Sequence, residues 1–216
     1  MTVLIQDPTE KKALAHFLDH CLIQTYPPRQ TFIRAGEQND VLYYIIEGSV
    51  SVNSQVEGRG LVYTYLNQGE FIGEVGFFHE LQTKEVDVKT RCRSTLASIS
   101  YPEFRRLLKN ELLYDAVNLL FIIGRQLATR LLLVSRNFCD LAFMDTEGRI
   151  ARCLMDLSKE PEAVEVPEGT KIHVTRKELS RLVGCSREIA GKFLKDLETR
   201  QLIAIEGKYI VVFKAD

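Results

Sequence analysis

The sequence predicts an α+β protein in three parts, and three patterns support this prediction. Residues 24–100 hold short apolar or alternating runs separated by glycines, which is typical of a β-barrel or jelly roll. Residues 115–141 contain almost no helix breakers and repeat apolar side chains every three or four positions, which indicates a long helix. Residues 175–213 have the pattern of two short helices joined by a tight turn and followed by a β-hairpin.

The composition is that of a globular protein, with 45% hydrophobic and 26% charged residues among 216. No apolar run approaches the about 20 residues needed to span a membrane, and the start, MTVLIQDPTEKK, lacks a signal-peptide pattern. We therefore expect a cytoplasmic protein without a membrane partner. A short helix is expected at Glu10–His20.

The cysteines are scattered and form neither a CxxC motif nor a cluster with histidine, so no metal site is expected. We expect them to be reduced and mostly buried. They are Cys21, Cys92, Cys139, Cys153 and Cys185.

Charge is divided unevenly along the chain, although the net charge is only −1. Residues 171–216 hold ten Lys/Arg against six Asp/Glu, whereas residues 1–170 hold eighteen against twenty-three. A positive C-terminal segment on an acidic body favours a nucleic-acid-binding module attached to a second domain.

One stretch of the expected barrel, GEFIGEVGFFHELQTKEVDV, does not alternate as a strand does. Turn-forming residues around Gly73–Gly76 can direct backbone N–H groups into a concavity that holds an anion, and Lys84 can reach the same place. The alternative is a plain surface loop. A metal-dependent barrel enzyme would need clustered ligands, and only His79 lies in this region, so an enzyme is not expected.

The long helix carries a heptad seam of about three repeats, which favours a homodimer. Leu119, Ile122, Ile123 and Leu132 give it a second apolar side, expected to face the barrel. A single chain that buries the seam against its own barrel is the alternative. The expected dimer residues are Leu120, Gly124, Leu127, Leu131, Val134, Phe138 and Leu141.

A domain joint is expected at residues 142–145, with Asp145 capping a helix at Thr146–Leu157 and an exposed polar loop at 158–171. The expected domains are therefore residues 1–114, 115–141 and 142–216.

The C-terminal helix pair has clear boundary signals. Thr175 and Glu178 form a capping box, Gly184 supplies the turn, and Ser186 caps the second helix. The apolar positions of this second helix predict one face in the core. They are Ile189, Ala190, Phe193, Leu194 and Leu197.

The opposite face is polar and mostly basic, and it opens with Arg187 and Glu188. Arginine can pair with both acceptors of guanine and glutamate can accept from cytosine, so this face suits the major groove of DNA. The following hairpin, with its turn at Glu206–Gly207, is expected to be the wing of a winged helix. An ordinary helical hairpin with a solvated face is the alternative.

Three segments, YLNQGEFIGE, LAFMDTEGRIA and VGCSRE, resemble the cyclic AMP receptor protein family of bacterial transcription regulators, and the likeness covers nearly the whole chain. The resemblance implies a cyclic-nucleotide-binding β-roll, a dimerisation helix and a winged helix-turn-helix. It assigns base reading to Arg187, Glu188 and Lys192, and phosphate contacts to Thr175 and Arg176. The full expected DNA-binding set is Thr175, Arg176, Ser186, Arg187, Glu188, Lys192 and Lys195.

The resemblance also implies an effector site, which departs from the cyclic AMP pattern. Gly73 and Glu74 match the turn and the ribose acceptor, but Lys84-Glu85 stands where the family has an Arg-Ser phosphate pair. A carboxylate beside a phosphate repels it by about 4 kcal/mol at 4 Å and an effective dielectric near 20. The expected nucleotide-binding set is Gly73, Glu74, Val75, Lys84, Glu85, Val134 and Ser135.

Val134 replaces a family threonine that meets adenine, whereas Ser135 is retained. A basic residue followed by Glu-Val resembles the branch that responds to cyclic di-GMP, whose members bind DNA without ligand. We therefore expect no obligatory cofactor, a cyclic di-GMP or cyclic AMP effector, and DNA binding without cyclic AMP.

The expected function is that of a homodimeric transcription regulator that binds TGTGA-type palindromes and contacts RNA polymerase. The 158–171 loop lies where the family has its main activating surface. The second, basic surface is absent, because its positions are Leu22, Gln24 and Glu103. The alternative is a nucleotide-sensing scaffold whose winged helix contacts protein.

Overall fold

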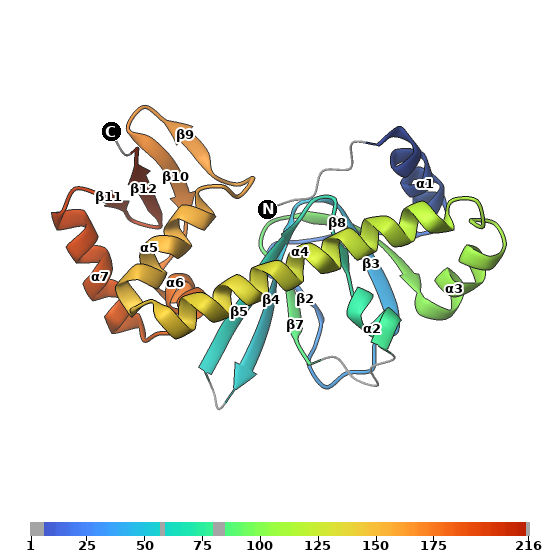
Figure 1. The fold of residues 1–216 in the computed structure, drawn as a ribbon, viewed down its shortest axis with the longest axis horizontal. Helices are drawn as coiled ribbons and strands as arrows, with labels where there is room; N and C mark the ends of the chain where they lie inside the picture. Colours follow the sequence, from blue (N-terminus) through green and yellow to red (C-terminus); the bar gives the residue numbers. More distant parts are fainter. Residues whose placement is uncertain (1–6, 57–58, 80–84, 215–216) are drawn as a thin grey trace. The chain divides into compact units, whose positions relative to one another are not determined.

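The computed structural model describes residues 7–56, 59–79 and 85–214, which fall into two compact units. One unit holds residues 63–133 and the described part of 2–58. The other holds residues 59–62 and the described part of 134–216. The mixture of helices and strands confirms the predicted α+β class (Figure 1).

Two four-stranded sheets, ordered β1-β8-β3-β6 and β2-β7-β4-β5, form the roll of the N-terminal unit, apart from residues 59–62 at the start of β5. Apolar side chains such as Ile45, Val50 and Leu96 are buried in the roll and form one core cluster. The strands are β1 (Leu22–Tyr26), β2 (Thr31–Ile33), β3 (Val41–Glu47), β4 (Ser49–Val56), β5 (Arg59–Asn67), β6 (Phe71–Ile72), β7 (Asp87–Thr90) and β8 (Ser94–Ser100).

Three shorter helices belong to this unit: α1 (Pro8–Asp19), α2 (Glu74–His79) and α3 (Tyr101–Lys109). The Phe17 ring of α1 lies 5.5 Å from Phe71 and 5.3 Å from Phe104 between ring centroids, so these aromatic rings join both helices to the roll. Helix α1 begins two residues before the predicted Glu10, because Asp7 accepts from the Thr9 N–H at 2.8 Å and Pro8 suits a first turn.

Helix α4 runs from Ala116 to Phe143, close to the predicted 115–141. Its side chains Leu119, Ile122 and Ile123 are buried, as expected. The expectation for Leu132 is wrong, since 72% of this residue is exposed. The buried residues of α4 all lie between Leu119 and Gln126, so the helix has left the core of the roll before it reaches Leu132.

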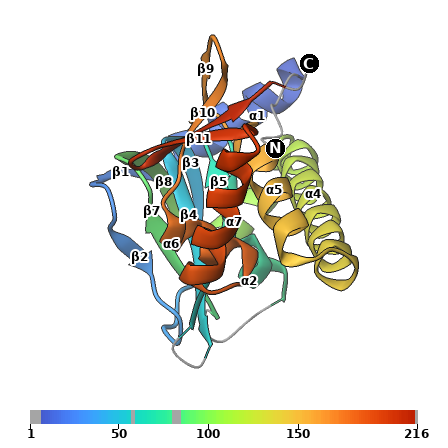
Figure 2. The same cartoon turned by 90° about the vertical axis from the view of Figure 1, so that its left-hand side faces the viewer.

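The C-terminal unit packs three helices on a sheet of order β11-β12-β10-β9, and Figure 2 views it with α6 and α7 toward the reader. Gly169 allows the close pairing of β10 with β12, because a Cβ there would lie 2.0 Å from the carbonyl oxygen of Val212. The elements are α5 (Thr146–Leu157), β9 (Val164–Val166), β10 (Gly169–His173), α6 (Arg176–Val183), α7 (Arg187–Thr199), β11 (Ile203–Glu206) and β12 (Tyr209–Phe213).

Candidate DNA-binding surface and effector site

Helix α6 and the turn after it have the predicted boundary residues. The Thr175 hydroxyl accepts from the Glu178 N–H at 3.2 Å, and the Glu178 carboxylate accepts from the Thr175 N–H at 2.9 Å, which completes the capping box. Gly184 ends the helix at φ 72°, a left-handed conformation that favours glycine. Ser186 then caps α7 by accepting from the Ile189 N–H at 3.2 Å. These contacts fix where α7 starts and which face it exposes.

Helix α7 buries Ala190, Leu194 and Leu197 in the core of the C-terminal unit. The expectation for Ile189 is wrong, because 42% of it is exposed. Ile189 lies only one position before Ala190, and the small Ala190 occupies the contact with the core, so the buried face is rotated slightly away from the predicted one.

The outward face of α7 presents the side chains predicted to meet DNA. Arg187, Glu188, Lys192 and Lys195 are all exposed. The backbone N–H of Glu188 itself and the Ser186 hydroxyl hold the pKa of the Glu188 carboxyl below its usual range, so its carboxylate is a ready acceptor. Within the described ranges, Arg187, Lys192 and Lys195 make no ion pair.

Arg176 brings the start of α6 into the same surface. It lines one shallow pocket with Arg187, Glu188 and Gly191. A Cβ at Gly191 would lie 3.8 Å from the Cδ of Arg176, an ordinary contact, so the two helices approach closely here. Arg176, Arg187 and Glu188 therefore form one continuous polar surface.

The hairpin of β11 and β12 has the predicted turn, with Gly207 at φ 66°. The Val174 N–H donates to the Lys208 carbonyl oxygen at 3.1 Å, which ties this hairpin to the residue before the Thr175 cap. The hairpin is therefore held beside the start of α6, as in a winged helix.

The second candidate site lies around α2. Residues 74–79, part of the stretch predicted to be an irregular loop, form a helix, and this correction has a local cause. Gly73, at φ 93°, turns its carbonyl oxygen to accept from the N–H groups of Gly76 and Phe77 at 3.0 and 3.3 Å. These two N–H groups are therefore used within the helix and do not point into a concavity.

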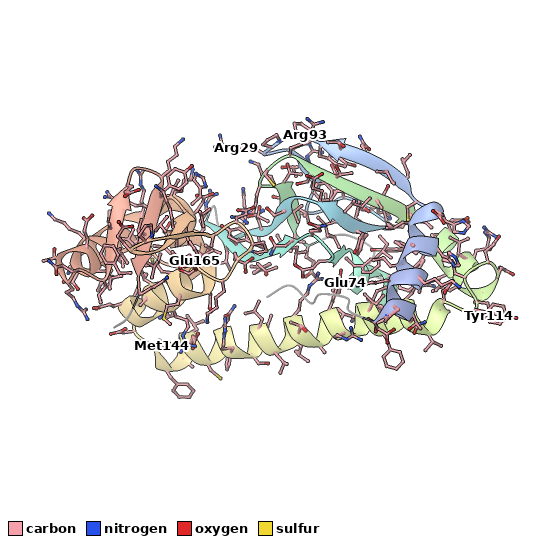
Figure 3. All side chains as sticks on the ribbon, turned by 90° about the horizontal axis from the view of Figure 1, so that it is seen from above. Arg29, Glu74, Arg93, Tyr114, Met144 and Glu165 are labelled. Carbon is pink, nitrogen blue, oxygen red and sulfur yellow. The ribbon has the colours of Figure 1, made fainter. Side chains whose placement is uncertain are left out.

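Glu74, the predicted ribose acceptor, is buried and forms an ion pair with Arg130 of α4. Figure 3 shows Glu74 between the strands of the roll and α4. Arg130 also donates to the Phe71 carbonyl oxygen at 2.7 Å, and it lies 3.5 Å from Glu70. Burial raises the pKa of Glu70, although Arg130 opposes this shift.

Four polar residues around α2 were not predicted from the sequence. Gln126 accepts from the Phe71 N–H at 2.9 Å and donates to the Gly69 carbonyl oxygen at 2.8 Å. Tyr101, Arg105 and Arg130 donate to backbone carbonyls of residues 71–77. The one signal available in the sequence was for Gln126, a polar residue on an otherwise apolar helix face.

The other predicted nucleotide residues fall in different parts of the chain. Val75 is half exposed, and Glu85 is exposed. Lys84 lies outside the described residues. Val134 and Ser135 lie on the part of α4 that belongs to the C-terminal unit.

The predicted dimer seam lies on the outward side of α4. Leu127 is half buried and Gly124 is exposed. The other positions are 39% to 70% exposed in the single chain, which leaves a long apolar stripe uncovered. These positions are Leu120, Leu131, Val134, Phe138 and Leu141.

Helix α4 is also long and apolar enough to cross a membrane, judged by length and composition alone. A heptad seam and a buried face toward the roll explain the same composition in a protein without a membrane span. Arg125, Arg130 and Arg136 on this helix each pair with a carboxylate.

The cysteines are less buried than predicted: Cys139 is exposed and the others are half buried. Cys139 lies outside the heptad seam on α4, where neither the core nor the seam covers it. All five have free thiols and none forms a disulfide. In the described part of the chain, no three His, Cys, Asp or Glu side chains are grouped to hold a metal ion.

Comparison with known protein families matches both units. Residues 23–111 match the cyclic nucleotide-binding domain, and residues 148–215 match the Crp-like helix-turn-helix domain. The chain is 44% identical over 208 residues to the cAMP-activated global transcriptional regulator CRP of Pasteurella multocida, covering 96% of this chain and 95% of that protein. It is 43% identical over 219 residues to the CRP-like protein Clp of Xanthomonas oryzae, covering 99% and 95%.

Among solved structures, the fold matches the c-di-GMP responsive global regulator CLP of Xanthomonas campestris. The TM-score is 0.90 with 44% identity, over 95% of this chain and all of that one. This fold and these two domains define a helix-turn-helix transcription regulator with a cyclic nucleotide-binding domain, and not an enzyme. The chain belongs to the CRP family of transcription regulators. Membership implies DNA binding and a homodimer.

Proposed function

We propose that this protein is a homodimeric regulator in the cytoplasm that reads TGTGA-type palindromes through α7 and binds them without cyclic AMP. The observation that carries the DNA assignment is the exposed, unpaired basic face of α7 beside Arg176. Arg187 reads guanine, Glu188 accepts from cytosine, and Lys192 contacts a third base as a point charge. Thr175, Arg176, Ser186 and Lys195 contact the sugar–phosphate backbone.

The dimer assignment rests on the uncovered stripe of α4. Two such helices packed in parallel would bury Leu120, Leu127, Leu131, Val134, Phe138 and Leu141 in one seam. A two-fold dimer would place two α7 helices in successive major grooves of a palindrome. The domain organisation that we propose remains 1–114, 115–141 and 142–216.

The effector assignment rests on the family domain and on Glu74. Gly73, Glu74 and Val75 would meet the sugar of a nucleotide, Lys84 its phosphate, and Ser135 its base. A nucleotide hydroxyl must share or replace the Arg130 partner of Glu74, so binding is coupled to α4. Glu85 and Val134 disfavour cyclic AMP in the usual pose, and the relative titled as responsive to c-di-GMP favours that dinucleotide.

DNA binding without cyclic AMP follows from two replacements. Val134 makes the dimer seam apolar where a threonine would need a polar partner, and Glu85 supplies a fixed negative charge where the family binds phosphate. Both substitute for part of what a cyclic nucleotide contributes, so the DNA-binding arrangement can dominate without it. The exposed 158–171 segment is the proposed contact with RNA polymerase.

A mobility-shift titration of the purified protein on a TGTGA-type palindrome and on a scrambled duplex tests this function. We expect the palindrome to shift at protein concentrations about a thousandfold or more below those that shift the scrambled duplex. Equal shifts of both duplexes would refute sequence-specific reading, and no shift of either would favour the scaffold alternative, in which the winged helix contacts protein.

A further inference from the structure

Helix α2, which carries Glu74 and Val75, is attached to α3 by two polar contacts spaced one helical turn apart. The Tyr101 hydroxyl donates to the Gly73 carbonyl oxygen at 2.5 Å. The Arg105 guanidinium donates through Nη2 to the Phe77 carbonyl oxygen at 2.9 Å. Donors and acceptors are each four residues apart, so one face of α3 matches one face of α2.

Aromatic packing fills the space between these two contacts. The Phe77 ring lies 5.7 Å from Tyr101 and 5.1 Å from Phe104 between ring centroids. The guanidinium carbon of Arg105 lies 5.2 Å from the centroid of the same ring. Phe77 is buried, so α2 is attached to α3 by both its backbone and its main apolar side chain.

A helix as short as Glu74–His79 is marginal without such support. Its last carbonyl groups have no intrahelical partner, and Arg105 supplies one of them with a charged donor. Burial, together with the neighbouring Glu74, raises the pKa of Tyr101, so its hydroxyl keeps the proton that it donates to Gly73.

We propose that Tyr101 and Arg105 are positioning residues for the effector site, which hold α2 in the place where Glu74 and Val75 can meet a nucleotide. This inference rests on the proposed effector site. Neither side chain contacts the nucleotide itself. Residues 110–115 connect α3 to α4, so the contacts of α2 with α3 also link the effector site to α4.

The test uses full-length Arg105→Ala and Tyr101→Phe, with Arg106→Ala as the matched control. Arg106 is the neighbouring exposed arginine of α3, but it pairs with Glu103 and Glu111 and not with α2. Two quantities are measured: amide hydrogen exchange of residues 74–79 without nucleotide, and calorimetric affinity for cyclic AMP and cyclic di-GMP.

We expect Arg105→Ala to speed exchange in residues 74–79 by about tenfold or more, as loss of a charged hydrogen bond implies. Nucleotide affinity should fall about threefold or more, because the apparent Kd rises as the competent fraction falls. Tyr101→Phe should shift both quantities in the same direction. Arg105→Lys, which keeps a cationic donor, should recover part of both losses, and Arg106→Ala should leave both within about twofold of wild type.

Unchanged exchange in Arg105→Ala would overturn the proposal, and so would faster exchange with wild-type nucleotide affinity. Wild-type protein that binds neither nucleotide would instead refute the effector site of the proposed function, and the positioning role with it. The affinity of the wild type therefore distinguishes the two failures.

Discussion

Arg130 of α4 forms an ion pair with the buried carboxylate of Glu74 at the start of α2. The Glu74 side chain is 4% exposed and that of Arg130 is 20% exposed, so neither charge is well solvated. The residue assigned to hold a nucleotide is therefore already bound to the helix assigned to form the dimer.

Removing Arg130 should leave the Glu74 charge buried without its main partner. We expect Arg130→Met to lower the free energy of unfolding by about 3 kcal/mol, measured by urea denaturation. The double variant Glu74→Gln, Arg130→Met should recover most of this loss. Arg136→Met is the control, because its pair with Asp156 is far more exposed and should cost at most about 1 kcal/mol. Equal losses in the two single variants would contradict this account of the pair.

The dimer seam predicts a charge-sensitive helix surface. Leu131→Asp would place two carboxylates in the apolar seam and should yield monomers in sedimentation. Leu132→Asp is the matched control, since Leu132 is equally exposed in the single chain but lies outside the seam. It should leave the dimer intact. A Leu131→Asp protein that sediments as a dimer would show that α4 is not the interface.

The assigned docking of α7 predicts two different effects of arginine removal. Arg187→Ala should lose about 1–3 kcal/mol of discrimination against the wrong base at one position. Arg176→Ala should weaken binding to all duplexes alike and reduce the salt dependence. Binding to the palindrome and to single-base variants at several salt concentrations separates these effects. Wild-type discrimination by Arg187→Ala would exclude it from base reading.

The cysteines offer a check on the packing of both units. Burial raises the pKa of Cys21 and Cys153 to about 12, so at pH 8 neither forms an appreciable thiolate. We expect a thiol reagent at pH 8 to modify the exposed Cys139 first, and the half-buried Cys21 and Cys153 much more slowly. Peptide mass spectrometry over a time course identifies the order. Early labelling of Cys153 would contradict the packing of α5.

Local signals predicted much of the C-terminal unit. The Thr175 capping box, the left-handed Gly184, the Ser186 cap and the Gly207 turn depend on neighbours within a few residues, and the structure confirms each. The start of α5 at Thr146 was predicted for the same reason, because Asp145 caps it.

Long-range contacts explain what the sequence could not predict. The Gly73 and Phe77 carbonyl oxygens accept from Tyr101 and Arg105, which follow 28 residues later. The ion pair of Glu74 joins residues 56 positions apart. No spacing rule reports such a contact, so α2, α3 and the role of Arg130 were missed.

The most direct test of the account is the affinity of the nucleotide-free wild-type dimer for a TGTGA-type palindrome, measured by fluorescence anisotropy with and without cyclic AMP. A Glu85→Ser, Val134→Thr double variant, which restores two family residues, is measured beside it. We predict that the wild type binds tightly without nucleotide and changes little with cyclic AMP, whereas the double variant gains a dependence on it. Wild-type protein that binds the palindrome only after cyclic AMP is added would contradict the account.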